Sequence, residues 1–147
     1  MVDTLKPSQR SHLMSRVKGR ETEIERILRS ILHTKGFRFR KNVRDLPGRP
    51  DILLPKFKVA IFVHGCFWHG HIGCAKSRLP TTRVSFWQEK RSANRARDER
   101  NILELLSLGW RVAVVWGCAL ENAVSTARAI NDLIVWINSD EKTGEIP

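Results

Sequence analysis

The sequence predicts a single α/β domain. Two runs of apolar and β-branched residues, 58–63 and 110–116, are typical of strands buried on both faces of a sheet. Stretches with helical periodicity precede, separate and follow these runs, and neither an internal repeat nor a low-complexity linker interrupts the 147 residues. We therefore expect one domain over residues 1–147, large enough to enclose a hydrophobic core of its own.

A basic arm and an amphipathic helix are expected in the first quarter of the chain. Residues 1–20 are basic and polar, which favours an arm or a short helix. Beyond them, apolar side chains recur at the i, i+3, i+4, i+7 and i+8 spacing of one helical face, namely Ile24, Ile27, Leu28, Ile31 and Leu32. Gly36 is expected to end this helix, because glycine takes the left-handed conformation without strain.

Strands and a turn follow the helix. Phe37, Phe39 and Lys41 alternate as strand residues do, LPGRP predicts a turn, and DILL begins a further short strand. The buried run at 58–63 leads directly into His64. The stretch HGCFWHGHIGC, residues 64–74, is therefore expected at the carboxyl end of a central strand, where sheet-based sites commonly form.

In the second half, Ser85–Leu108 is expected to be a basic helix with Ser85 at its N-cap. The run 110–116 is the second buried strand, and residues 120–136 form the last expected helix. Residues 139–147 are mostly polar and are expected to be a tail. The predicted order is helix, three strands, helix, strand, helix.

Net charge points to the class of partner. The chain has 26 Lys and Arg against 15 Asp and Glu, a formal charge of +11. A domain this basic favours a polyanion, and nucleic acid is the leading candidate over a membrane surface. No run approaches the roughly 20 apolar residues of a membrane span, and residues 1–10 lack the apolar core of a signal peptide. We expect a cytosolic protein that does not bind membranes.

Cysteine and histidine spacing suggests a metal site. The chain has three cysteines, an odd number that argues against a disulfide framework in the cytosol. Cys66, His71 and Cys74 have C-x4-H-x2-C spacing, and Cys118 follows the second buried strand. Four such ligands suit structural zinc. Two alternatives stay open: Cys118 as a buried thiol, and His69 in place of His71 as the ligand.

Two histidines and two carboxylates are candidates for catalysis. His64 and His69 lie beside glycines at a strand end, where imidazole suits a general base, a phosphate contact or a simple loop hydrogen bond. Asp51 begins a strand and could share Mg²⁺ with that site, although such pairs with proline are often only turns. Glu25 lies at the edge of the apolar helical face, yet Thr22-x-x-Glu25 also fits a capping box.

Aromatic side chains lie next to these candidates. Phe67 and Trp68 are adjacent in a polar loop flanked by glycines, and Trp87 opens the basic helix. Burial in the core is the usual fate of such residues. In basic surroundings, however, exposed aromatic side chains can act as wedges between base pairs. We expect this role for Phe67 and Trp68, with Trp87 divided between wedge and core.

The segments LPGRPD, VHGCFWHGHIGC, TRVSFWQEK and GWRVAVVWGCAL, in this order and spacing, closely resemble the very short patch repair (Vsr) endonucleases of bacteria. The similarity covers about residues 4–122. It implies an α/β fold with a mixed central sheet flanked by helices, related to the PD-(D/E)xK restriction endonucleases and carrying a structural zinc site. It also implies Mg²⁺-dependent nicking of double-stranded DNA, 5′ of the thymine in T:G mismatches that arise from deamination of 5-methylcytosine.

The resemblance assigns a role to individual residues. Asp51 matches the Mg²⁺-binding aspartate, and Val63 matches the position whose main-chain carbonyl reaches the same metal. His69 matches the proposed base, with His64 and Glu25 in support. The implied zinc ligands are Cys66, His71, Cys74 and Cys118. The implied DNA contacts are the wedge residues Phe67, Trp68 and Trp87 together with Met14 of the arm. One departure from the wider superfamily is Phe62-Val63-His64, which stands where (D/E)xK is expected, so histidines must replace the lysine.

The implied partner is double-stranded DNA with a T:G mismatch, and other mismatch-repair proteins are further candidates. Nicking needs a single active site, which favours a monomer, and the implied location is the bacterial cytoplasm at the nucleoid. Two other functions compete with this one. A non-catalytic mismatch-binding module would bind without cutting in Mg²⁺, and a sequence-specific restriction endonuclease would cut both strands of matched DNA.

Overall fold

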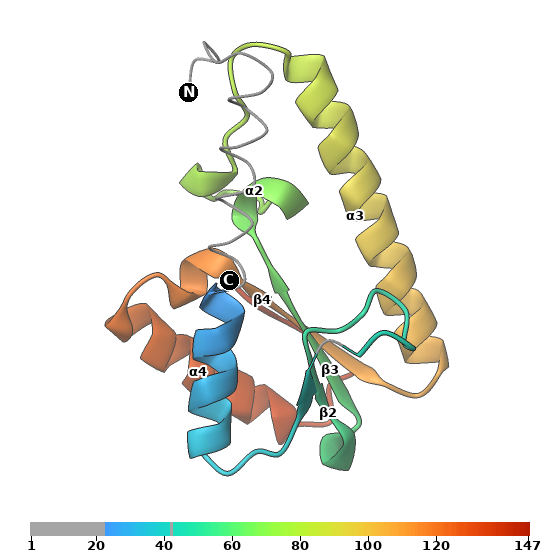
Figure 1. Ribbon diagram of the computed structural model, residues 1–147, viewed down its shortest axis with the longest axis vertical. Coiled ribbons are helices and arrows are strands. Elements are labelled where there is room, and N and C mark those ends of the chain that lie inside the picture. The colour runs from blue at the N-terminus through green and yellow to red at the C-terminus, as the bar shows by residue number, and fades with distance from the viewer. Residues whose placement is uncertain (1–22, 42) are drawn as a thin grey trace.

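A five-stranded mixed sheet forms the centre of the molecule (Figure 1). The computed structural model describes residues 23–41 and 43–147, so the predictions for the basic arm, Met14 and the Thr22 capping box lie outside the described residues. The strands follow the order β1-β2-β3-β4-β5 and comprise Arg40–Lys41, Ile52–Leu54, Val59–His64, Arg111–Trp116 and Thr143–Ile146. The first two pairings are antiparallel and the last two parallel, which confirms the α/β class with a mixed sheet.

The parallel pair β3–β4 positions the candidate site. Every residue of β3 is buried, as the apolar run predicts. The pair runs in register from Val59 opposite Arg111 to His64 opposite Trp116, so both strands end at the same edge of the sheet. The segments that follow the two strands, α2 (Cys66–His69) and a 3-10 turn (Gly117–Leu120), therefore begin side by side.

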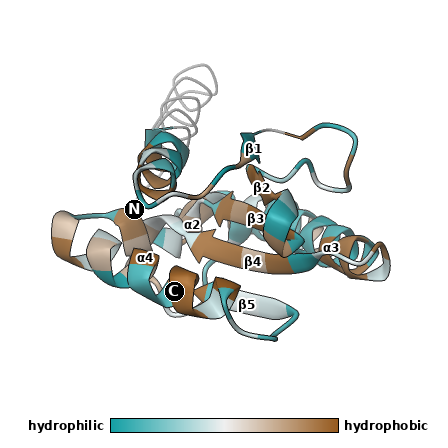
Figure 2. Ribbon diagram, turned by 90° about the horizontal axis from the view of Figure 1, so that it is seen from below, coloured by the Kyte–Doolittle hydropathy of each residue, from teal (hydrophilic) through white to brown (hydrophobic). Residues whose placement is uncertain are grey.

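Helices cover both faces of the sheet. Alternate β3 residues enter two separate cores, because successive strand side chains point to opposite faces. Val59, Ile61 and Val63 pack with the helix at residues 23–34 and with α4 (Ala123–Ile137). Ala60 and Phe62 pack on the other face with the C-terminal part of α3 (Val84–Ser107). Figure 2 shows β3 and β4 as the hydrophobic centre between these layers.

The helix at residues 23–34 keeps most of its predicted apolar face. Leu28 and Leu32 are fully buried, whereas Ile27 is 42 % exposed. Gly36 follows the helix with φ of 95°, as expected for a terminating glycine. Phe37 and Phe39 do not belong to a strand; they pack against the core, and only Arg40–Lys41 forms β1. The alternation there reflects core packing rather than strand pairing.

Helix α3 differs from its prediction at the N-terminus. It starts at Val84, and the N-cap is Arg83, which has φ of 55° and makes no side-chain cap. The expectation of Ser85 at the N-cap is therefore wrong, because Ser85 already lies inside the first turn. Of its 24 residues only Trp87 and Leu105 are buried, and the N-terminal half extends beyond the sheet beside α2 (Figure 1).

The C-terminal segment contains a strand where a polar tail was expected. Helix α4 starts at Ala123 behind a capping box of Asn122 and Ser125. At its end, the Arg111 guanidinium donates to the carbonyls of Trp136, Ile137, Ser139 and Glu141. These bonds direct the chain into β5, which pairs in parallel with β4. The strand was not predicted because it has four residues and buries only Ile146.

No helix among the described residues is both long enough and apolar enough to cross a lipid bilayer.

Candidate active site and metal-binding cluster

Many of the predicted site residues lie on or beside a single helical turn, which directs their side chains to different parts of the molecule. Helix α2 begins after Gly65 and ends at Gly70, whose φ is 67°. Because each residue rotates the side chain by about 100° in a helix, consecutive residues of α2 point in different directions. Cys66 meets the other cysteines, Phe67 and Trp68 meet Trp87, and His69 meets α3. The side chains of the HGCFWHGHIGC stretch, residues 64–74, thus separate in space into three groups.

The first group contains the four residues expected to bind zinc. Ligand atoms of Cys66, His71, Cys74 and Cys118 all lie within 4.8 Å of one another. The Sγ atoms of Cys66 and Cys118 are 3.5 Å and 3.4 Å from His71 Nδ1. Burial raises the pKa of the Cys66 thiol to about 12. This set could hold a metal ion, and the histidine in it is His71 rather than His69.

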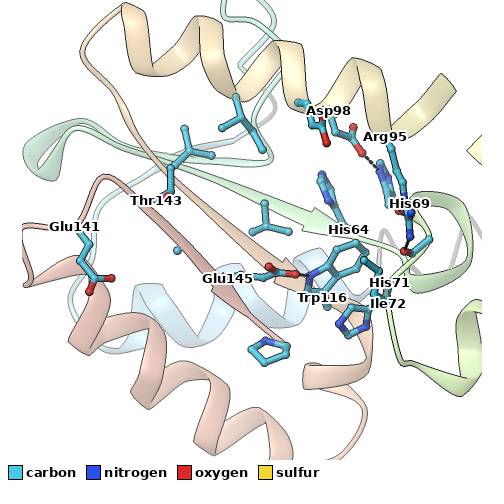
Figure 3. A pocket seen from close by; sticks show the side chains of 17 residues that line it. His64, His69, His71, Ile72, Arg95, Asp98, Trp116, Glu141, Thr143 and Glu145 are labelled. Carbon is cyan, nitrogen blue, oxygen red and sulfur yellow. Dashed lines mark hydrogen bonds and ion pairs between the residues drawn. The ribbon is translucent and has the colours of Figure 1, made fainter. Parts of the chain in front are cut away.

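Residues of β4 and β5 hold the ring of His71, the candidate zinc ligand, in place. Its ring stacks on Trp116 of β4, with centroids 4.3 Å apart and planes 8° from parallel. The Trp116 indole N–H donates to Glu145 of β5 (Figure 3). Burial lowers the pKa of His71, and the Glu145 carboxylate opposes that shift. The unpredicted strand β5 therefore contributes to the ordering of the cluster.

His64 and His69 form the second group. Their rings stack with centroids 3.9 Å apart and planes 3° from parallel. Burial lowers the pKa of His64 to about 3, and the neighbouring His69 acts in the same direction. His64 is therefore neutral near pH 7. The edge of Trp116, with its centroid 5.4 Å from that of His64, links this group to the cysteine cluster.

His69 has an aspartate partner on α3. The distance from His69 Nδ1 to Asp98 Oδ2 is 2.6 Å. An aspartate that accepts from Nδ1–H orients the ring and leaves Nε2 as the nitrogen able to take up a proton. Asp98, His64 and His69 also offer ligand atoms within 4.8 Å of one another. The two rings are stacked, so they cannot both direct an in-plane lone pair at one ion.

Asp51 and Glu25 complete a cleft around the histidines. The cleft has a volume of about 800 Å³, and its lining includes Glu25, Asp51, Val63, His64, His69 and Asp98. Asp51 Oδ2 accepts a hydrogen bond of 2.7 Å from the Val63 amide. Burial raises the pKa of Asp51 to about 7, and the negative charge of Glu25 adds to the rise. Glu25 also pairs with Arg29 at 3.5 Å.

The third group is aromatic. Ring centroids of Phe67 lie 5.6 Å from those of both Trp68 and Trp87. Phe67 and Trp68 are half-buried, whereas Trp87 is only 5 % exposed and Phe86 beside it is 42 % exposed. Trp87 therefore forms the base of the group, and the two loop residues lie nearer its surface.

Comparison with known proteins identifies the family of this chain. A family model described as DNA mismatch endonuclease Vsr matches residues 2–76. The chain is 50 % identical over 122 residues to the type II nicking enzyme V.XorIIP of Xanthomonas oryzae pv. oryzae, covering 83 % of this chain and 89 % of the relative. It is 40 % identical over 148 residues to the DNA mismatch endonuclease Vsr of Escherichia coli K12, covering 99 % and 94 %. The chain belongs to the Vsr family.

Asp98 is the residue of this Vsr-family site that the sequence did not reveal. It lies in the charged run RARDER, which reads as a solvated helical surface. Asp98 lies on the same helical face as Arg91, Asn94 and Arg95, but this spacing alone does not single it out as a partner of His69. Among the other predicted residues, the structure brings Glu25, Asp51, Val63, His64 and His69 to one cleft, and it buries Trp87 beneath Phe67 and Trp68.

Gly70 is expected to tolerate no side chain in this Vsr-family protein. A Cβ there would lie 2.8 Å from Arg91 Cγ and 2.9 Å from Arg95 Nε, and its φ of 67° is left-handed. Gly70→Ala should lower the free energy of unfolding by about 2–3 kcal/mol, combining backbone strain with displacement of two arginines. Urea denaturation measures the change. Gly73→Ala is the matched control, because Gly73 has φ of 78° with nothing within 4 Å of its Cβ position. Equal losses in both variants would exclude the crowding argument.

Proposed function

We propose that this protein is a DNA mismatch endonuclease that nicks one strand 5′ of the thymine in a T:G mismatch, by Mg²⁺-dependent hydrolysis. The observation that carries the proposal is the single cleft containing Asp51, Glu25, His64 and His69, one helical turn from an aromatic pair. The relatives support it, because their names describe a mismatch endonuclease and nicking enzymes. The start of β2 beside the end of β3 also supports kinship with the PD-(D/E)xK fold.

The oxygen donors of the cleft fit Mg²⁺. The negative charge of Glu25 adds to the rise in the pKa of Asp51, so a cation bound beside the two carboxylates would relieve their repulsion. Mg²⁺ prefers oxygen ligands, and Asp51 with the Val63 carbonyl would hold it. When bound, it would supply charge stabilisation to the phosphate under attack. Asp51 must be ionised for this role.

The cysteine cluster fits structural zinc. In a tetrahedral site with ordinary Zn–S and Zn–N lengths, a sulfur and a nitrogen ligand are separated by about 3.5 Å. The two Sγ–Nδ1 distances to His71, 3.5 Å and 3.4 Å, agree with this geometry. Cys66, His71, Cys74 and Cys118 would hold the ion with no open position. Its role would be to tie the α2 loop to the segment after β4.

His69 is the proposed base. Asp98 holds its Nδ1–H, so Nε2 can accept the proton of an attacking water. The neutral His64 ring stacks against His69 and limits its rotation. Glu25 supports Asp51 in the same cleft. These side chains supply the proton transfer for which the wider superfamily uses lysine.

The aromatic pair is the proposed DNA wedge. Phe67 and Trp68 are half-buried, and the buried Trp68 Nε1 finds no acceptor among the described residues. Rotating the Trp68 side chain out of this packing therefore breaks no side-chain hydrogen bond. Insertion between base pairs costs less at a wobble mismatch than at a matched pair, which favours selectivity. The formal charge of +11 attracts the duplex.

A nicking assay tests the proposed function. The zinc-loaded protein is incubated with Mg²⁺ and either a T:G duplex or the matched T:A duplex, over a panel of flanking sequences. We expect one nick, 5′ of the thymine, only in the T:G duplex. His69→Ala should reduce the rate by about 100-fold or more, because it removes the base. Binding without a nick would favour a mismatch-binding module, double-strand cleavage of T:A duplex would favour a restriction enzyme, and an active His69→Ala protein would contradict the base assignment.

A further inference from the structure

The backbone carbonyls at the C-terminal end of α2 need partners outside their own helix. Inside this one-turn helix, the His69 amide donates to the Gly65 carbonyl, and the amides of Gly70 and His71 donate to the Cys66 carbonyl. The carbonyls of residues 67–70 accept no hydrogen bond within this turn. Buried carbonyls that lack a donor are costly, so their partners reveal what holds the loop.

Helix α3 supplies a donor to each of these carbonyls. Arg91 Nη2 donates to the Phe67 carbonyl at 2.9 Å, and Asn94 Nδ2 donates to the Trp68 carbonyl at 2.9 Å. Arg95 donates from Nε to the His69 carbonyl at 3.4 Å and from Nη2 to the Gly70 carbonyl. The main-chain carbonyl of each residue from Phe67 to Gly70 is therefore hydrogen-bonded to α3.

The same face of α3 also holds the side chain of His69. Arg91, Asn94, Arg95 and Asp98 follow the i, i+3, i+4, i+7 spacing of one helical face. Asp98 binds the His69 ring, while its three neighbours bind the backbone around that ring. The Arg91 guanidinium also lies over the Phe67 ring, 5.4 Å from its centroid. Aromatic pair and histidine are thus anchored to one rigid helix.

The guanidinium groups of Arg91 and Arg95 both contact the main chain of the protein itself. Arg91 is half-buried, and burial together with the nearby Arg95 lowers its pKa. Keeping two cations adjacent is unfavourable unless both are needed where they lie. Their attachment to carbonyls also offsets the partial negative charge at the end of α2. Arg95 is exposed, as Arg100 is, but its guanidinium donates to the His69 and Gly70 carbonyls of its own chain.

We propose that Arg91, Asn94 and Arg95 are positioning residues that hold Phe67, Trp68 and His69 at a fixed mutual spacing, so that wedge insertion and placement of the base occur together. The proposal rests on the proposed function for its DNA side. Its protein side is independent of DNA, because the loop must be held by α3 whether or not a duplex is bound.

Hydrogen exchange of the zinc-loaded protein tests the protein side. The amides of residues 66–71 are followed by mass spectrometry in wild type, Arg91→Ala, Arg95→Ala and Arg100→Ala, with zinc content measured for each. We expect exchange to become about tenfold faster in the first two variants, as the loss of charge-assisted hydrogen bonds allows. Arg100→Ala removes the same charge from an exposed position and should leave exchange unchanged. Arg95→Lys, which keeps the positive charge but has one donor nitrogen in place of two, should give an intermediate exchange rate.

The DNA side is tested with single-turnover nicking at saturating T:G duplex and with the salt dependence of binding. Arg95→Ala should lower the nicking rate by about 100-fold, because displacement of a catalytic group by about 1 Å has such an effect. Its slope of log K against log salt should match wild type, whereas loss of a phosphate contact would lower the slope by about 0.9. Arg100→Ala should nick at the wild-type rate.

Three outcomes would overturn the proposal: unchanged exchange in Arg91→Ala and Arg95→Ala, faster exchange with an unchanged nicking rate, or a lower salt slope in Arg95→Ala. A wild-type protein that nicks no duplex would instead overturn the proposed function, and the exchange measurements would still decide whether α3 holds the loop.

Discussion

Asp51→Asn is expected to abolish Mg²⁺-dependent nicking and, at the same time, to stabilise the protein at pH 8 in the absence of Mg²⁺. Folding raises the pKa of Asp51 from 3.8 to about 7, mainly through burial. Between these values the folded state binds a proton that the unfolded state has lost. The stabilising effect of that proton is complete below pH 3.8 and is lost as pH rises through 7. Asparagine removes the ionisation but can still accept the Val63 amide.

Urea denaturation from pH 4 to pH 8, with zinc retained, measures the effect. The two proteins should have similar stability at pH 4, and the variant should be more stable by about 2–4 kcal/mol at pH 8. Added Mg²⁺ should stabilise only wild type and narrow the gap. Asp140→Asn, at an exposed position, is the control and should change neither stability nor nicking. If the free energy of unfolding changed with pH equally in wild type and Asp51→Asn, the expectation would be refuted.

Under the proposed zinc assignment, Cys118→Ser is expected to lose the ion and much of the stability of the protein. Cys118 follows β4, and the other three ligands lie within residues 66–74, so the cluster closes a loop of 51 intervening residues between Cys66 and Cys118. Binding of structural zinc contributes strongly to folding, because the unfolded chain does not hold a preformed site. We expect the free energy of unfolding to fall by at least about 3 kcal/mol, as removal of one member of a buried polar set commonly does.

Metal analysis and denaturation check this expectation together. Wild type should contain one zinc per chain, and Cys118→Ser less than half of that after dialysis. The exposed ion pair between Lys76 and Glu121, 3.0 Å long, joins the same two segments. Lys76→Ala is therefore the matched control and should cost less than about 1 kcal/mol. A folded Cys118→Ser protein with full zinc content would exclude the four-ligand site.

The parts of the fold that could be predicted from sequence have strong local signals. Strands β3 and β4 are continuous apolar runs, and the helix at residues 23–34 has a regular apolar face. The cysteine cluster was predictable because its ligand types are rare in the chain. Spacing alone did not decide between His69 and His71. The structure separates them by the single turn of α2, which directs His69 to α3 and leaves His71 beside Trp116.

The parts that could not be predicted depend on tertiary contacts. Asp98 lies among charged residues, and its role follows only from the packing of α3 beside α2. Strand β5 owes its position to Arg111, which binds carbonyls contributed by the end of α4 and the segment after it. The N-terminus of α3 starts without a side-chain cap, so a search for capping residues selects Ser85 instead. Local sequence carries none of these contacts.

The attachment of the α2 loop to α3 sets the smallest unit that could be transplanted in protein design. Grafting residues 64–74 alone onto another sheet would transfer the ligands, the aromatic pair and the histidines, but not the donors for four carbonyls. A working graft would need the face of α3 from Arg91 to Asp98, and also the Cys118 turn after a parallel neighbouring strand. The α2 loop, the α3 face and the Cys118 turn would therefore have to be transferred together.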